Sequence, residues 1–196
     1  VYIGNQVKNI GIGAFANTAN MKYIYYNANA ESIGKTGNGS YPFAGAGSNS
    51  SITLEIGKDV ISVPALFAND ANNEFNVTKV IFEENGMCTT IGELAFKYFD
   101  IEEIVLPKTL NKIDGFASST AAFANCKNLK KIYWYGNAID IATDEYYSSS
   151  QKKWVTEITT FVYGGTAKNG LDEFQTHMRG KGTNAAAPSL EIILIK

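Results

Sequence analysis

The sequence predicts a solenoid of the α/β type: a right-handed coil with a parallel sheet of short strands and with irregular or short helical return segments. Three observations support this class. An apolar triplet with offsets of zero, three and five recurs along the chain, a phenylalanine precedes most triplets, and the central strand residues of successive units between Ile24 and Phe161 are 24 to 30 residues apart. Repeats of this length are typical of chains in which every unit forms one coil stacked on the next.

The apolar triplet is clearest at 101–106, where Ile101, Ile104 and Leu106 form it. Because its last two positions are two residues apart, they share one face of a strand, and the residue between them faces the other way. The other copies are Met21/Ile24/Tyr26, Val77/Val80/Phe82, Leu129/Ile132/Trp134, Ile158/Phe161/Tyr163 and Leu190/Ile193/Ile195, and an incomplete copy has Ser51 before Leu54 and Ile56. Each copy predicts a short strand that stacks in parallel on its neighbours.

Phenylalanines and Ile-Gly pairs supply the return path of each predicted coil. The phenylalanines, which we expect to fill the far side of the core, are Phe15, Phe43, Phe67, Phe96 and Phe123. The pairs are Ile10-Gly11, Ile33-Gly34, Ile91-Gly92 and the variant Ile113-Asp114. We interpret the glycine as the residue that allows a tight turn, and Pro64 and Pro107 as marking places where strand pairing stops.

Residues 101–134 follow the order L..I..L-P...L..I-(G/D)....AF..C..L..I, with Cys126 in the cysteine place. This order resembles the BspA-like leucine-rich repeat family of bacterial cell-surface proteins. The resemblance covers residues 1–163 as about five to six units, irregular at 27–75 and 137–157. It implies a right-handed leucine-rich-repeat coil in a secreted or cell-surface protein of a host-associated bacterium. Family members resemble adhesins that bind host or bacterial proteins, and no common catalytic site can be carried over.

The carboxyl-terminal segment, 164–196, differs from the repeats. Leu171, Phe174 and Met178 recur at helical spacing before Gly180, so we expect a short helix followed by a final strand, acting as a partial cap or as the last coil. Because Val1 begins within a unit, we expect a piece of a longer array. Such a piece would be a monomer or would associate through its solenoid ends.

Composition and charge exclude several classes of function. The 17 basic and 19 acidic residues are dispersed, which gives no basic field for nucleic acid. The longest apolar run, near 190–195, is far below the roughly 20 residues of a transmembrane segment. Cys88 and Cys126 occur without a CxxC motif or a His/Cys cluster, so we expect buried free thiols and no zinc site. We predict no cofactor.

Several apparent chemical motifs are coincidental. GKT at 34–36 lacks the glycine that a phosphate-binding loop needs five residues earlier. His177 has no partner at the spacing of a metal site or a catalytic triad. Asp140, Asp144 and Glu145 match no calcium loop. We therefore predict neither catalytic residues nor metal ligands. Between 141 and 158 no Ala-Phe pair occurs, and Tyr147 or Trp154 could take its packing role or bind a partner.

Residues between the core positions of each triplet should face outward and form columns along the stacked coils. One predicted column is Tyr23, Thr53, Lys79, Glu103, Lys131 and Thr160, and the next is Tyr25, Glu55, Ile81, Val105, Tyr133 and Val162. The first alternates in sign, which favours cross-strand pairing, and the second is mostly apolar and aromatic. Exposed tyrosine offers a large contact area at low entropy cost. Valine, isoleucine and tyrosine are also good strand formers, so these residues could serve the sheet alone.

The candidate binding residues are thus Tyr23, Tyr25, Glu55, Lys79, Ile81, Glu103, Val105, Lys131, Tyr133 and Val162. The leading hypothesis is an extracellular binding module, without catalysis, that presents its sheet to a protein or extracellular-matrix ligand. The alternative is a structural spacer that holds another domain off the cell surface. A binder should carry a patch of exposed aromatic residues on one face, whereas a spacer should be polar on every face.

Overall fold

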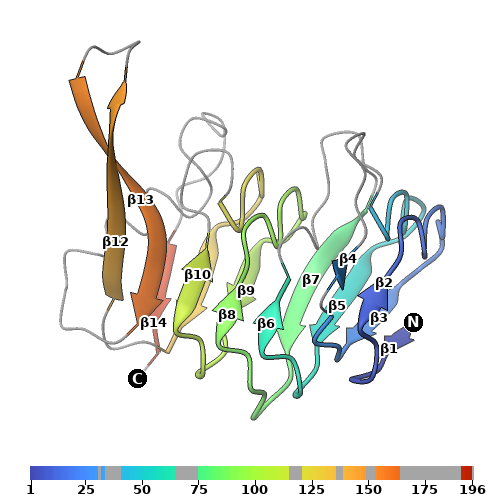
Figure 1. Ribbon diagram of the computed structural model, residues 1–196. Helices are drawn as coiled ribbons and strands as arrows, with labels where there is room; N and C mark the ends of the chain where they lie inside the picture. The colour runs from blue at the N-terminus through green and yellow to red at the C-terminus, as the bar shows by residue number, and fades with distance from the viewer. Residues whose placement is uncertain are drawn as a thin grey trace.

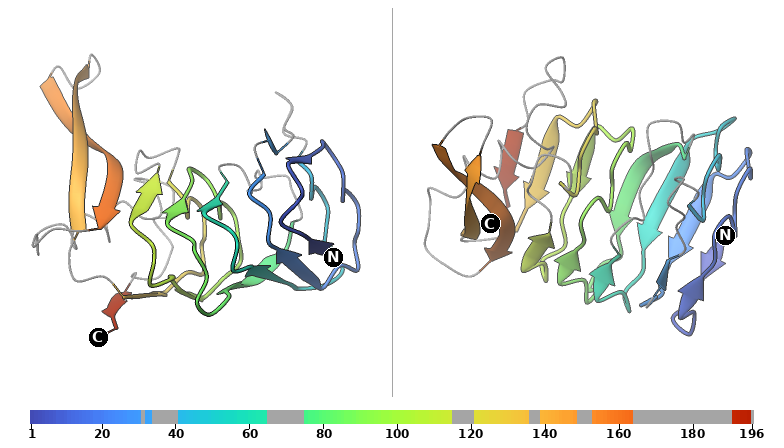
Figure 2. Two further views of the ribbon diagram at one scale, coloured as in Figure 1. Left: turned by 60° about the horizontal axis from the view of Figure 1, so that its bottom comes forward. Right: turned by 45° about the horizontal axis from the view of Figure 1, so that its top comes forward.

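The computed structural model describes residues 1–30, 32–33, 41–64, 75–114, 121–135, 139–148, 153–163 and 191–195. These residues form stacked coils with two rows of strands, one row of longer strands and one of shorter strands, as Figures 1 and 2 show. The two rows form separate faces of the coil and enclose the apolar core between them.

The longer strands carry the predicted triplets. A four-stranded parallel sheet contains β1 (Tyr2–Ile3), β3 (Tyr23–Tyr26), β5 (Ile52–Ile56) and β7 (Val77–Phe82). A second parallel sheet contains β9 (Glu103–Val105), β11 (Lys131–Trp134) and β14 (Glu191–Leu194). The central triplet residues pair as predicted, with Ile24 opposite Leu54, Leu54 opposite Val80, and Ile132 opposite Ile104. The prediction of a parallel solenoid is confirmed for these coils.

The second row consists of short strands that the sequence did not reveal. The strands β2 (Asn9–Ile10) and β4 (Ser32–Ile33) pair in parallel, and so do β6 (Ser62–Val63), β8 (Thr90–Ile91) and β10 (Lys112–Asp114). The isoleucine of each Ile-Gly pair therefore lies in a strand. No helix occurs in the described ranges, so the returns are turns and short strands, and the helical part of the α/β prediction is not seen. The expected helix at 171–178, Phe67 and His177 lie outside the described residues.

Phenylalanine rings stack along the array inside the turns; Phe15, Phe43, Phe96 and Phe123 were predicted to lie on this side of the core, whereas Phe75 and Phe99 were not. Phe15 lies 5.0 Å from Phe43, and Phe43 lies 5.1 Å from Phe75, both nearly parallel. The row continues through Phe99 to Phe96, and Phe96 lies 5.1 Å from Phe123. Of these rings only Phe15, in the first coil, is half-buried, whereas the others are buried. Stacked rings of adjacent coils thus join the coils through the core.

In the described residues, the residue two positions after each repeat phenylalanine has a left-handed backbone. These residues are Asn17, Gly45, Tyr98 and Asn125, with φ between 58° and 71°. The amide of Asn17 then donates to the carbonyl of Ala44 at 2.8 Å, and the amide of Tyr98 donates to Ala124 at 2.9 Å. Asparagine and glycine tolerate this conformation at low cost, which explains their frequency at the position. Gly11 and Gly92 accept a turn hydrogen bond from Ala14 and Ala95 but have no positive φ, so the left-handed residue of the turn is not the glycine that follows isoleucine.

Two details of the triplet prediction are wrong. In the incomplete copy Ile52, and not Ser51, is buried, because a register shift between Ile52 and Thr53 brings Ile52 opposite Val77. In the last copy, the pairing places Ile192 and Leu194 opposite the core residues Ile132 and Trp134. Ile193 pairs with the outward-facing Tyr133, so the predicted triplet of Leu190, Ile193 and Ile195 is displaced by one residue.

The predicted strand around Phe161 does not join the parallel row. Strands β12 (Ile139–Ser148) and β13 (Lys153–Tyr163) form an antiparallel hairpin that projects beyond the coils (Figure 1). The hairpin pairs antiparallel with β10, where Phe161 lies opposite Ile113. It therefore covers the last edge of the sheet β6-β8-β10, and such cover blocks edge-to-edge pairing with another chain. Tyr147 lies opposite Trp154 within the hairpin.

Candidate functional site

The outward residues of the longer strands form the columns that the sequence predicted. Tyr23, Thr53 and Lys79 are in register, as are Tyr25, Glu55 and Ile81. Further along, Glu103 pairs with Lys131 and Val105 with Tyr133. Thr160 and Val162 do not continue these columns, because their strand, β13, pairs antiparallel with β10 and β12. The assignment of Val162 to this sheet face is therefore wrong.

Tyrosine hydroxyls on this face bind glutamates of other coils; Tyr23 and Tyr133 reach an adjacent strand, and Tyr25 reaches past β5 to the end of β7. Tyr23 donates to Glu55 Oε2 at 2.5 Å, Tyr25 donates to Glu83 Oε2 at 2.7 Å, and Tyr133 donates to Glu103 Oε2 at 3.5 Å. Glu83 Oε2 also accepts the backbone N–H of Lys58 at 2.9 Å. These bonds fix the orientation of Tyr23 and Tyr25, so the rings are held in place before any partner arrives.

An aromatic cluster lies on the first coils of the face. The ring of Tyr2 lies 6.0 Å from Tyr23 and 5.6 Å from Tyr25, and both pairs are tilted. Tyr2 is 78% exposed, while Tyr23 and Tyr25 are half-buried. Three adjacent rings with an exposed outer member form an apolar surface, and the neighbouring carboxylates Glu55 and Glu83 give it negative charge.

The tyrosine-glutamate bonds make a prediction about high pH. The hydrogen bond to Glu55 raises the pKa of Tyr23 to about 12, and the bond to Glu83 raises the pKa of Tyr25 to about 12. Because these values lie above the ordinary value of 10.0, the stabilisation is complete below pH 10 and is lost as pH rises towards 12. We expect phenolate absorbance to show late-titrating tyrosines that Tyr23→Phe and Tyr25→Phe remove. An unchanged titration curve in both variants would contradict these bonds.

The predicted ion pairing along the charged column is not formed. The structure places an ion pair one residue away, between Lys130 and Glu102 at 3.4 Å, and both side chains are largely exposed. Lys79 cannot reach Glu103 through strand pairing, because β7 and β9 belong to separate sheets. Exposed pairs of this kind contribute little to stability, so the charges remain available at the surface.

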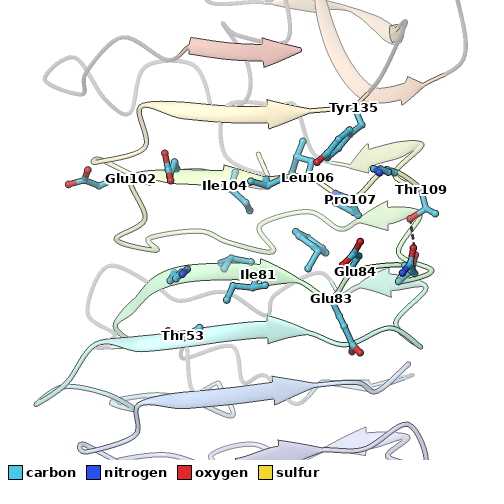
Figure 3. A pocket seen from close by; sticks show the side chains of 18 of the residues that line it. Thr53, Ile81, Glu83, Glu84, Glu102, Ile104, Leu106, Pro107, Thr109 and Tyr135 are labelled. Carbon is cyan, nitrogen blue, oxygen red and sulfur yellow. Dashed lines mark hydrogen bonds between the residues drawn. The ribbon is translucent and has the colours of Figure 1, made fainter. Parts of the chain in front are cut away.

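A groove with a volume of about 1140 Å³ lies where the row of longer strands is interrupted, between β7 and β9 (Figure 3). Its lining includes the core-facing side chains Val80, Phe82, Ile104 and Leu106. Outward-facing Ile81 and Val105 also line it, together with Tyr135 and the charged residues Lys79, Glu84, Glu102, Glu103 and Lys108. The groove thus combines an apolar floor with charged margins, which is the usual composition of a ligand site.

A model of the BspA type leucine-rich repeat region matches six copies in this chain, over residues 1–130 and 37–162. The chain belongs to the BspA-type leucine-rich repeat family. Proteins of this family are generally secreted or at the cell surface, and their repeats generally mediate protein interaction from a scaffold that is typically non-catalytic. Neither the curated proteins nor the solved structures contain a match.

Cys126 occupies the cysteine position of the BspA-type repeat and has a structural role in the core. Cys126 is fully buried, and its thiol donates to the carbonyl of Phe96 at 3.0 Å. Cys88 is also buried, and burial raises its pKa to about 11, which keeps it a neutral thiol. Both cysteines are free, as predicted. Within the described ranges no group of three potential metal ligands occurs, and no helix there has the length and apolarity of a membrane span.

Sequence reasoning found the outward columns but missed the groove. Phe82 was assigned to the core, and Glu84, Lys108 and Tyr135 were not singled out, because none belongs to an outward triplet position. The interval between Val80 and Ile104 is 24 residues, the shortest between successive triplets. That interval is the one sequence feature that distinguishes the interrupted coil.

Proposed function

We propose that this chain is an extracellular, adhesin-like binding module that presents the sheet face of β1, β3, β5, β7, β9 and β11 to host or bacterial macromolecules and carries out no catalysis. The contact residues that we propose are Tyr23, Tyr25, Glu55, Lys79, Ile81, Glu103, Val105, Lys131 and Tyr133, with Tyr2 added from the structure. The cluster of Tyr2, Tyr23 and Tyr25 is the observation that carries the proposal.

The aromatic cluster favours a binder over a spacer. A spacer needs no exposed aromatic surface, and exposed tyrosine brings a risk of nonspecific association. Here Tyr2 is the most exposed large apolar side chain in the described part of the chain, and it lies against two rings that glutamates hold in place. Ordered aromatic residues next to charge are frequent among the residues that dominate binding energy.

The double variant Tyr2→Ser/Tyr25→Ser tests this proposal. Binding of the intact chain should be measured on a biosensor against a panel of purified extracellular-matrix and serum proteins. We expect at least one protein to bind, and the double variant to bind it about 100-fold more weakly, at about tenfold for each tyrosine. Circular dichroism and the unfolding midpoint would confirm that the variant is folded.

Ile61→Ser is the matched control. Ile61 is 52% exposed and lies beside β6, in the row of shorter strands, whereas Tyr2 and Tyr25 lie in the row of longer strands. This variant removes exposed apolar surface of similar character, and its affinity should be unchanged. Equal loss of affinity in the control and the double variant would contradict a specific role of the tyrosines. A panel that shows no binding at all would favour the spacer.

A further inference from the structure

The hairpin that covers β10 ends its sheet with a strand that has no partner on its outer side. In the sheet order β12-β13-β10-β8-β6, β12 is the terminal strand, and it pairs with no described strand other than β13. Every second residue of an edge strand directs its backbone N–H and C=O groups away from the sheet. With ten residues, β12 is the longest terminal strand among the described sheets, and such edges accept an additional strand.

The distal half of the hairpin is a ribbon of only two strands. β10 pairs with 160–162 of β13, the register shifts between Ala142 and Thr143, and beyond this bulge 143–148 and 153–158 pair only with each other among the described residues. Figure 1 shows this part of the hairpin reaching past the coils. A two-stranded ribbon is marginally stable at best in water, whereas a third strand adds a second ladder. The distal half is therefore the part that an added strand would stabilise most.

The register brings two acidic residues to directly opposite positions in this half. Asp144 of β12 lies opposite Glu157 of β13, which places both on one face of the ribbon, and Glu145 occupies the other face. Like charges at opposite positions destabilise a ladder. Lys153, the only basic residue of the two strands, is four residues from Glu157, about 13 Å along β13. The acidic pair therefore has no basic residue at a neighbouring position of the ribbon.

Aromatic residues follow the acidic residues towards the tip of the hairpin. Tyr146 lies opposite Val155, and Tyr147 lies opposite Trp154. Along β12 two acidic residues are thus followed by two aromatic residues, at 144–147. Because consecutive residues of a strand alternate between its faces, each face of the ribbon has one acidic and one aromatic position on β12. A strand with two adjacent basic residues beside two β-branched or aromatic residues complements both faces.

We propose that the outer edge of β12 binds an extended segment of a partner protein that contains two adjacent basic residues flanked by β-branched or aromatic residues. The segment adds to the ribbon as a third strand. One basic residue lies opposite Asp144, on the face that Asp144 shares with Glu157, and the other lies opposite Glu145. This edge belongs to a different sheet from the tyrosine cluster, so the inference goes beyond the proposed function.

Three labelled eight-residue peptides of valine, threonine and two charged residues would test the proposal by fluorescence anisotropy with the intact chain. One has two lysines at its centre, one has two glutamates at its centre, and one has a lysine at each end. We expect the central-lysine peptide to bind at least tenfold more tightly than the other two, and less tightly as the salt concentration rises. No binding, or equal binding of all three peptides, would overturn the proposal.

Backbone methylation distinguishes strand addition from charge attraction alone. Methylating every second amide nitrogen of the central-lysine peptide removes the backbone donors from one of its two edges. Of the two alternating sets, one should abolish binding, and the other should leave the affinity within threefold. The bound peptide should also slow amide hydrogen exchange within 143–148. Binding that tolerates both sets, or exchange unchanged in this segment, would show that no third strand forms.

Variants connect the binding to β12. Asp144→Asn and Glu145→Gln remove a charge with little change of shape, and each should weaken the central-lysine peptide about threefold to tenfold. Asp144→Asn also removes the like-charge pair, so its thermal midpoint should be no lower than that of the original chain, which separates lost binding from lost folding. Asp140→Asn makes the same change in the same strand, outside the residues 141–148 that the peptide would cover, and should have no effect. Unchanged affinity in both Asp144→Asn and Glu145→Gln would sink the idea.

Two other occupants of this edge are outcomes of the same assay. A dimer of the chain that the peptide dissociates, and that Asp144→Asn strengthens, would show that a second copy occupies the edge and would overturn the proposal. Phosphatidylserine vesicles that bind the chain and compete with the peptide would overturn it in favour of a lipid surface. The Tyr2→Ser/Tyr25→Ser variant should bind the peptide as the original chain does. Peptides that fail to bind would therefore reject only this inference, and a protein panel without binding would reject only the proposed function.

Discussion

Replacing Phe96 with alanine should lower the free energy of unfolding by about 3–5 kcal/mol, the usual range for a buried phenylalanine. Phe96 is fully buried and contacts Phe82, Phe99 and Phe123. Its loss therefore removes the ring that joins three coils and leaves a cavity that rigid strands on both sides cannot close. Urea unfolding followed by circular dichroism would measure the change, provided that the slope with urea is the same in both proteins.

Phe15→Ala is the control for this prediction. Phe15 is half-buried and stacks on Phe43 from the first coil, so its truncation leaves a space that water can enter. We expect a cost of about 1–2 kcal/mol, in line with the smaller apolar area removed from water. A Phe96→Ala variant no less stable than Phe15→Ala would show that the phenylalanine row does not hold the coils together.

Replacing Asn27 with alanine should cost about 2 kcal/mol, although the side chain is small and polar. Asn27 is 8% exposed, donates from Nδ2 to Asp59 Oδ2 at 2.9 Å and accepts the backbone N–H of Asp59 at 2.8 Å. The variant leaves that N–H without its partner in a half-buried position, which carries a desolvation cost of about 1–3 kcal/mol. Thermal and urea unfolding would measure the change.

Asn5→Ala separates the effect of burial from the loss of one hydrogen bond. Asn5 donates to the same oxygen, Asp59 Oδ2, at the same distance of 2.9 Å, but it is exposed. Water replaces its bond, so we expect a cost of about 0.5 kcal/mol. Equal costs at Asn5 and Asn27 would contradict the role of burial in this prediction.

The sequence was sufficient for features that depend on local periodicity. Ile104 and Ile132 could be assigned to the core because residues two apart on a strand share a face, and the burial of both confirms this. The repeated phenylalanines predicted the far wall of the core in the same way. Outward residues such as Tyr25 and Glu55 followed from the same alternation, and their pairing across coils confirms the register.

Features that depend on long-range pairing could not be predicted. The strand around Ile91 has only two residues, too few for a period. Residues 158–163 have the same local pattern as the true repeats, and only their pairing with β10 and β12 makes them antiparallel. The groove arises from a ladder that is missing between two strands whose own sequences look regular. In each case the deciding interaction joins strands that are more than 20 residues apart in the chain.

The interruption between β7 and β9 affects only one wall of the coil, since β6, β8 and β10 remain hydrogen-bonded across the same coils. We therefore expect the array to bend more easily between β7 and β9 than elsewhere along the row of longer strands. Bending about the hydrogen-bonded strands β6, β8 and β10 changes the curvature of the row of longer strands, which carries Tyr23 and Tyr25, without breaking a hydrogen bond between paired strands. Tension along the array should therefore separate β7 from β9 before it separates the hydrogen-bonded strands β6, β8 and β10.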